Sequence, residues 1–199
     1  MTTVLLVRHG LTPLTGPVLA GWSPGVHLDE RGRETAAAIL AGREPAPPLH
    51  VDEQVGEVRY GAWTGRELRA LRKEPLWAVV QGHPSAAVFP DGEGLAEMSA
   101  RAVAAARRWN AALGPDATYA VVSHGDVIKA ILADALGLHL DGFQRIGVDP
   151  CALSVVRYAA TGTQVERVND TGGSVAALAP SGRAGRTRAR TRAARGAAR

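Results

Sequence analysis

Short apolar runs alternate along the chain with longer stretches of helical periodicity. Residues 3–7 and 119–122 are β-favouring runs that are too short for helices and typical of strands buried in a parallel sheet. Each run stops at a His-Gly pair, His9-Gly10 in the first case and His124-Gly125 in the second. We therefore predict two parallel strands with a histidine at the carboxyl end of each.

The remaining periodic segments predict two helices and a hairpin. Residues 97–113 and 126–136 place apolar side chains on one helical face, and Gly137 is suited to end the second helix. Residues 153–158 and 163–168 have the pattern of strands joined by a short turn. Strands alternating with helices indicate an α/β fold, expected here as a three-layer sandwich around a mostly parallel central sheet.

Length and composition are those of one globular domain. The chain has 199 residues, 46% of them hydrophobic, and no apolar run approaches the ~20 residues that cross a bilayer. The first residues lack the features of a secretory signal, so we expect a cytoplasmic protein. Cys151 is the single cysteine, which excludes an internal disulfide and a cysteine-rich zinc site.

The net charge of +4 arises from the end of the chain. Residues 181–199 hold seven arginines and no acidic residue, while the rest carries 16 basic and 19 acidic residues, a net charge of −3. With no aliphatic side chain larger than alanine, this segment cannot bury enough surface to offset the entropy of ordering. We predict a domain over residues 1–178 and a disordered arginine-rich tail over residues 179–199, solvated rather than bound to nucleic acid.

The two predicted strand ends carry the candidate chemistry. In open α/β sheets ligands bind at the carboxyl ends of the strands, beside helix N-termini whose free N–H groups attract anions. Glycine after each histidine permits close approach to a ligand. A neutral imidazole can attack phosphorus while Arg8 neutralises the phosphoryl oxygens, so the pattern favours a phosphate site.

These residues resemble the histidine phosphatase superfamily, which includes cofactor-dependent phosphoglycerate mutases and many small phosphatases. The likeness extends over nearly the whole predicted domain, and its detail is similar to an actinobacterial branch described as phosphomutases. The segments that carry it are Arg8-His9-Gly10 with Thr12, Gly21-Trp22, residues 28–32, residues 56–65, residues 89–93 and Ser123-His124-Gly125.

The resemblance implies a role for each candidate site residue. His9 would be the nucleophile that becomes phosphohistidine, and Arg8 and His124 would bind the transferring group. Glu57 would be the general acid, although its chemistry alone suits a solvated loop carboxylate equally well. Further phosphate contacts would come from Gly10, Thr12 and Gly125. The resemblance implies no metal ion and no organic cofactor.

One departure from the family pattern concerns a whole segment. The Ser-Pro-Leu-x-Arg turn, whose arginine is a further phosphate ligand, does not occur in this sequence. Residues 29–36 instead resemble the start of one family segment joined directly to the end of a later one. This pattern is expected if a helix-strand unit is missing. In one alignment Arg31 falls at the position of the absent ligand.

Several other residues carry weaker signals. Leu11 and Thr15 depart from the family pattern in a way that argues against a true phosphoglycerate mutase. We interpret the arginines Arg59, Arg66, Arg69 and Arg72 as solvated. We interpret the tryptophans Trp22, Trp63 and Trp77 as packing residues. The carboxylates Asp52, Glu53, Asp91 and Glu93 have no specific assignment.

The leading hypothesis is a phosphomonoester hydrolase or phosphomutase that acts on a small phosphorylated metabolite through phosphohistidine. The alternative is an impaired family member that binds phosphorylated ligands without efficient turnover, because of the missing segment. A third hypothesis is nucleic-acid binding through the arginine-rich tail.

Overall fold

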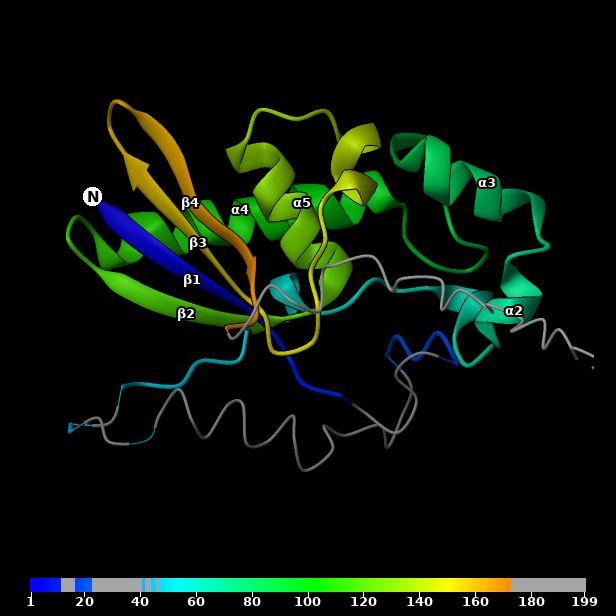
Figure 1. Cartoon of the computed structure of the whole chain (residues 1–199), viewed down its shortest axis with the longest axis horizontal. Helices are drawn as coiled ribbons and strands as arrows, with labels where there is room; N and C mark the ends of the chain where they lie inside the picture. The colour runs from blue at the N-terminus through cyan, green and yellow to red at the C-terminus, as the bar shows by residue number, and fades with distance from the viewer. Residues whose placement is uncertain (12–16, 23–40, 42–43, 46, 173–199) are drawn as a thin grey trace, which may run out of the picture.

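The described strands form one four-stranded sheet (Figure 1). The computed structural model describes residues 1–11, 17–22, 41, 44–45 and 47–172. Within them the strand order is β2-β1-β3-β4. The bounds are Thr2–Arg8 for β1, Thr118–Ser123 for β2, Leu153–Ala159 for β3 and Gly162–Asp170 for β4.

The strand pairing confirms part of the prediction and corrects part of it. β1 and β2 are parallel neighbours, and β3 and β4 form the predicted hairpin. The hairpin joins β1 in antiparallel orientation, so the described sheet is mixed rather than mostly parallel. β2 is an edge strand of the described sheet rather than a buried one, and the side chain of Val122 is 40% exposed.

The two long helices form where the periodicity predicts them. α4 extends over Leu95–Leu113 and α5 over Gly125–Ala135, and Gly137, at φ +64°, follows the end of α5. The sequence pattern missed the shorter elements, which contain too few turns to show a helical period. These are α2 (Leu68–Leu71), α3 (Pro75–Gly82), η1 (Glu53–Val55), η2 (Gly61–Trp63), η3 (Pro84–Ala86) and η4 (Leu140–Arg145).

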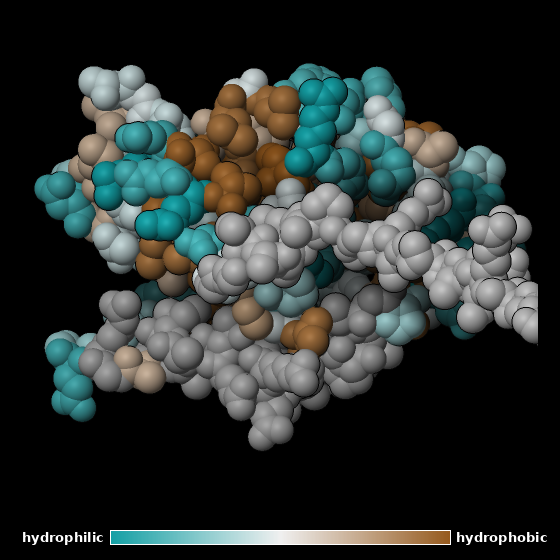
Figure 2. All heavy atoms as spheres, in the orientation of Figure 1, coloured by the Kyte–Doolittle hydropathy of each residue, from teal (hydrophilic) through white to brown (hydrophobic). Residues whose placement is uncertain are grey.

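The core lies between one face of the sheet and the helices. Val4 and Leu6 point from β1 into this core, and Met98 of α4 and Ile128 of α5 are fully buried there. Residues of α4 and α5 thus pack against β1 in a single core. Figure 2 shows apolar side chains gathered near the middle of the visible face, with polar side chains around them.

Several predicted features fall on residues that the structure does not describe. Thr12, Arg31 and Thr15 lie outside the described residues, as do the junction at residues 29–36 and the tail over residues 179–199. In the described part of the chain, no helix is both long enough and apolar enough to cross a membrane.

Candidate active site

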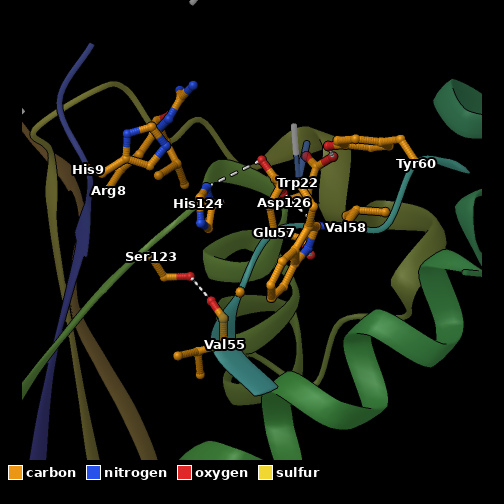
Figure 3. A network of polar contacts seen from close by, with 12 residues as sticks. Arg8, His9, Trp22, Val55, Glu57, Val58, Tyr60, Ser123, His124 and Asp126 are labelled. Carbon is orange, nitrogen blue, oxygen red and sulfur yellow. Dashed lines mark hydrogen bonds and ion pairs between the residues drawn. The ribbon is translucent and has the colours of Figure 1, made fainter. Parts of the chain in front are cut away.

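The candidate site lies at the carboxyl ends of β1 and β2. The parallel register pairs Arg8 with Ser123, and the backbone N–H of His9 donates to the Ser123 carbonyl oxygen at 2.9 Å. The imidazole rings of His9 and His124 therefore meet edge to face, with 4.7 Å between their centroids (Figure 3). The structure thus brings together the two histidines that the sequence places at separate strand ends.

A hydrogen bond determines which nitrogen of His9 carries the lone pair. Nδ1 of His9 lies 2.6 Å from the carbonyl oxygen of Gly10. Because a carbonyl oxygen can only accept, Nδ1 bears the hydrogen and donates it. In the neutral ring the lone pair is then on Nε2, the nitrogen on the opposite side of the ring. His9 is held in the tautomer that a nucleophile requires.

Arg8 and the start of α5 provide donors for an anion. Nη1 of Arg8 donates to the Val148 carbonyl oxygen at 2.6 Å, while its Nε is buried without a hydrogen-bond partner among the described residues. A Cβ added at Gly125 would lie 3.6 Å from the guanidinium carbon, so the start of α5 is adjacent to Arg8. Free N–H groups at a helix N-terminus attract anions. An oxyanion at this point would satisfy the buried Nε of Arg8.

His124 is neutral at physiological pH. Burial lowers its pKa to about 3, and electrostatic interactions with His9, Arg8 and Arg101 act in the same direction. A phosphate dianion between these groups would raise the pKa of His124 again by offsetting their charges. The groups around this imidazole therefore favour the binding of an anion.

Glu57 lies in the loop between η1 and η2, next to His124. Its Oε2 is 3.6 Å from Nδ1 of His124, which is too long for a hydrogen bond, and its Oε1 accepts from the backbone N–H of Val58 at 2.9 Å. The side chain is 19% exposed. Burial raises the pKa of Glu57 to about 7, and the charge of Asp126 adds to the effect, while the Val58 hydrogen bond and Arg8 oppose it. Glu57 is not the solvated carboxylate of the simpler interpretation.

Asp126 is a site residue that the sequence interpretation missed. It is the second residue of α5, and its Oδ2 is 3.5 Å from the hydroxyl of buried Tyr60, a long hydrogen bond. Its Oδ1 is 3.2 Å from Nζ of Lys129. The signal for it was its position directly after His124-Gly125, at the start of the predicted helix. Its charge helps to hold Glu57 protonated.

A hydrogen bond from β2 holds the segment that leads to Glu57. Ser123 is buried, and its hydroxyl donates to the carbonyl oxygen of Val55 at 2.6 Å (Figure 3). Val55 ends η1 and precedes Glu57 by two residues. β2, which ends immediately before His124, therefore also holds the segment that leads to Glu57.

The tryptophans, arginines and carboxylates with weaker sequence signals mostly have structural contacts. Trp63 is buried and stacks on Trp77, as predicted, but Trp22 is 44% exposed. Arg59 lies over the Trp22 ring, and Arg66 pairs with Glu74. The following carboxylates have structural partners: Asp52 with Arg108 and Trp109, and Glu93 with Arg101. Within the described ranges, no three His, Cys, Asp or Glu side chains are grouped so as to hold a metal ion.

Comparisons with solved structures agree with the fold. Bacillus stearothermophilus YhfR is 20% identical, with a TM-score of 0.76 over 86% of this chain and 98% of that one. The alpha-ribazole phosphatase from Shigella flexneri is 20% identical, with a TM-score of 0.70 over 84% and 96%. A phosphoserine phosphatase mutant from Entamoeba histolytica, solved with phosphoserine, is 17% identical, with a TM-score of 0.72 over 85% and 98%.

The search of curated proteins found no match. The family description "Histidine phosphatase superfamily (branch 1)" matches residues 30–171, which include Glu57 and His124. The solved structures share the α/β fold, and the family match covers well over half of the chain. The chain therefore belongs to the histidine phosphatase superfamily.

Proposed function

We propose that the protein transfers the phosphoryl group of a small phosphorylated metabolite through a phosphohistidine at His9. The observation that carries the proposal is that His124 lies next to both His9, whose lone pair is on Nε2, and Glu57, a carboxyl group whose pKa is about 7. Nucleophile and acid on either side of a phosphoryl group are the parts that such a transfer needs.

In the first half-reaction, Nε2 of His9 attacks phosphorus and the bond from phosphorus to the ester oxygen breaks. Glu57 gives its proton to the departing oxygen, which leaves as an alcohol. Arg8, His124 and the α5 N-terminus stabilise the phosphoryl oxygens as charge develops on them. The products of this step are phosphohistidine and the Glu57 carboxylate.

In the second half-reaction, an acceptor hydroxyl attacks the phosphohistidine and the carboxylate of Glu57 takes its proton. With water as acceptor, inorganic phosphate is released and the protein is a phosphatase. With a second substrate hydroxyl as acceptor, it is a mutase. Both routes return His9 and Glu57 to their starting states.

Similar proteins support the hydrolase over the mutase as the working assignment. Two of the compared structures are named as phosphatases, one for alpha-ribazole phosphate and one for phosphoserine. We propose a cytoplasmic phosphatase of small metabolites, without a nucleic-acid partner. The contributions of Thr12 and Arg31 to phosphate binding, the missing helix-strand unit and the likeness to the actinobacterial branch are part of this proposal.

Steady-state hydrolysis of an aryl phosphate tests the proposal. We expect His9→Ala to lower kcat by about a thousandfold or more, because the substitution removes the attacking nitrogen. His139→Ala is the matched control, because His139 is exposed and lies at the start of η4. A fully active His9→Ala protein would contradict the assignment. A folded wild-type protein that binds phosphate without turnover would favour the impaired binder instead.

A further inference from the structure

The backbone carbonyl oxygen of Glu57 is held by two side chains from distant parts of the sequence. Nε1 of Trp22 donates to it at 2.6 Å, and Nη2 of Arg101 donates to it at 2.8 Å. These donors are 35 and 44 residues away from Glu57 along the chain. Figure 3 shows the Trp22 ring beside Glu57, on the side away from His9.

Arg101 makes a hydrogen bond with every N–H of its guanidinium group. The side chain, on α4, is 11% exposed. Two of its bonds go to the carboxylate of Glu93, at 3.0 Å from Nε and 2.6 Å from Nη2. The other three go to the carbonyl oxygens of Gln54, Gly56 and Glu57, at 2.8 to 2.9 Å. Lysine cannot reproduce this planar fork, because its ammonium group is a point donor.

Glu93 completes the support of Arg101. Its Oε1 also accepts from the backbone N–H of Arg59 at 2.8 Å. The ion pair therefore bonds the chain on both sides of Glu57, through Arg101 before it and through Glu93 after it. Burial alone would raise the pKa of Glu93, but the hydrogen bonds from Arg101 and Arg59 outweigh it and lower the pKa. The ion pair therefore persists over the working pH range.

Trp22 packs on the backbone next to Glu57 because residue 56 is glycine. A Cβ at Gly56 would lie 2.5 Å from an atom of the Trp22 ring. The guanidinium carbon of Arg59 lies 5.4 Å from the centroid of the same ring. The ring is thus fixed in place although it is 44% exposed.

We propose that Arg101, Glu93 and Trp22 are positioning residues that hold Glu57 where its proton reaches the leaving group. The inference rests on the proposed function of Glu57. None of the three donates to a reacting atom; they act through the peptide oxygen of Glu57 and its neighbours. A displacement of about 1 Å at a catalytic group lowers the rate on the order of a hundredfold. Loss of the hydrogen bonds that hold the Glu57 backbone should therefore lower the rate measurably.

The test compares two substrates that differ in their need for an acid. A nitrophenolate leaves without protonation, whereas a simple alkoxide requires it. We would measure kcat/KM for nitrophenyl phosphate and for an alkyl phosphate with Trp22→Phe and Arg101→Lys. The controls are Trp77→Phe, which is away from the site, and Arg107→Lys, on the same helix in an exposed ion pair with Asp134. Glu57→Gln measures the full effect of losing the acid.

For Arg101→Lys we expect kcat/KM to fall about 10- to 100-fold for the alkyl phosphate and less than about threefold for the aryl phosphate. Trp22→Phe should show the same selectivity at about 3- to 10-fold, and the controls none. Equal losses on both substrates, or none, in Trp22→Phe would overturn the inference. If Arg101→Lys fails to fold, Trp22→Phe decides. If Glu57→Gln itself shows no selectivity, the proposed function of Glu57 fails as well.

Discussion

At the scale of single residues, the two titratable groups that face each other in the site have pKa values displaced in opposite directions. Burial raises that of Glu57 to about 7 and lowers that of His124 to about 3. Both displacements favour the neutral form. Below pH 7, Glu57 therefore mostly carries a proton while the neighbouring imidazole of His124 carries none, which is the starting state that the proposed mechanism requires.

These displacements affect folding stability with opposite signs. Glu57 binds its proton more tightly in the folded state, so its contribution is present below pH 4.5 and is lost as the pH rises to about 7. His124 binds its proton less tightly in the folded state, so stability is lost as the pH falls from 6.5 towards 3. Between pH 4.5 and 6.5 the two effects oppose each other.

Glu57→Gln isolates the first effect, because glutamine resembles the protonated acid. We expect the variant to gain stability relative to the wild type by roughly 2 to 3 kcal/mol between pH 5 and pH 8, measured by urea unfolding. Glu53→Gln, an exposed position in η1, is the control. A constant difference across this range would mean that Glu57 titrates as an ordinary surface carboxylate.

The sequence pattern predicted where the two histidines lie, but not the contacts that hold Glu57. The meeting of His9 and His124 follows from their positions at strand ends, because parallel strands end at the same edge. Arg101 gave no signal, since three of its five hydrogen bonds go to carbonyl oxygens 44 to 47 residues away, and any sequence has such oxygens. Glu57 was found only through resemblance, because its burial depends on the packing of several loops.

At the scale of elements, η2 depends on close contact between two loops. Gly61 has φ +52°, and a Cβ there would overlap the carbonyl oxygen of Pro90 and the backbone of Asp91 and Gly92. The 89–93 segment thus packs directly on the backbone that follows Glu57. Glycine is required here both by its conformation and by the lack of space.

Alanine substitution separates these two requirements. We expect Gly61→Ala to lower the free energy of unfolding by more than about 3 kcal/mol, since strain and overlap add. Gly65 has φ +79° but nothing within 4 Å of an added methyl group, so Gly65→Ala should cost only about 1 to 2 kcal/mol. Chemical denaturation of both variants provides the comparison. Equal losses would show that the 89–93 segment moves aside freely.

The long elements were predictable and their arrangement less so. β1, β2, α4, α5 and the hairpin follow the patterns of residues 3–7, 119–122, 97–113, 126–136 and 153–168. The order β2-β1-β3-β4 depends on which strand edges pair in three dimensions, and local pattern does not encode this. The short α2 and α3 depend on tertiary contacts for their stability, so they left no periodic signal.

At the scale of the whole molecule, charge separates the chain into two parts. Residues 181–199 carry seven arginines, whereas the remainder of the chain has a net charge of −3. β4, the last described strand, ends at Asp170. The candidate site lies within residues 8–126. We therefore expect catalysis to belong to the domain over residues 1–178 and not to the arginine-rich tail.

Removal of residues 179–199 tests this division. We expect the shortened chain to keep its phosphatase kcat/KM and to melt within about 2 °C of the full chain, because residues 181–199 have no aliphatic side chain larger than alanine. Salt-sensitive retention on heparin should fall sharply, since it depends on the clustered arginines. Loss of cooperative unfolding in the shortened chain would show that the tail is part of the fold.

Trapping of the phosphoenzyme is the sharpest test of phosphoryl transfer through His9. The full-length protein is mixed with nitrophenyl phosphate, quenched within milliseconds and digested, and the peptide carrying His9 is examined by mass spectrometry. We expect an acid-labile phosphoryl group on His9 that is absent from His9→Ala and accumulates more in Glu57→Gln, where the base for the second step is missing. Turnover of the substrate with no phosphoryl group on His9, or with the group on another residue, would contradict the proposed mechanism.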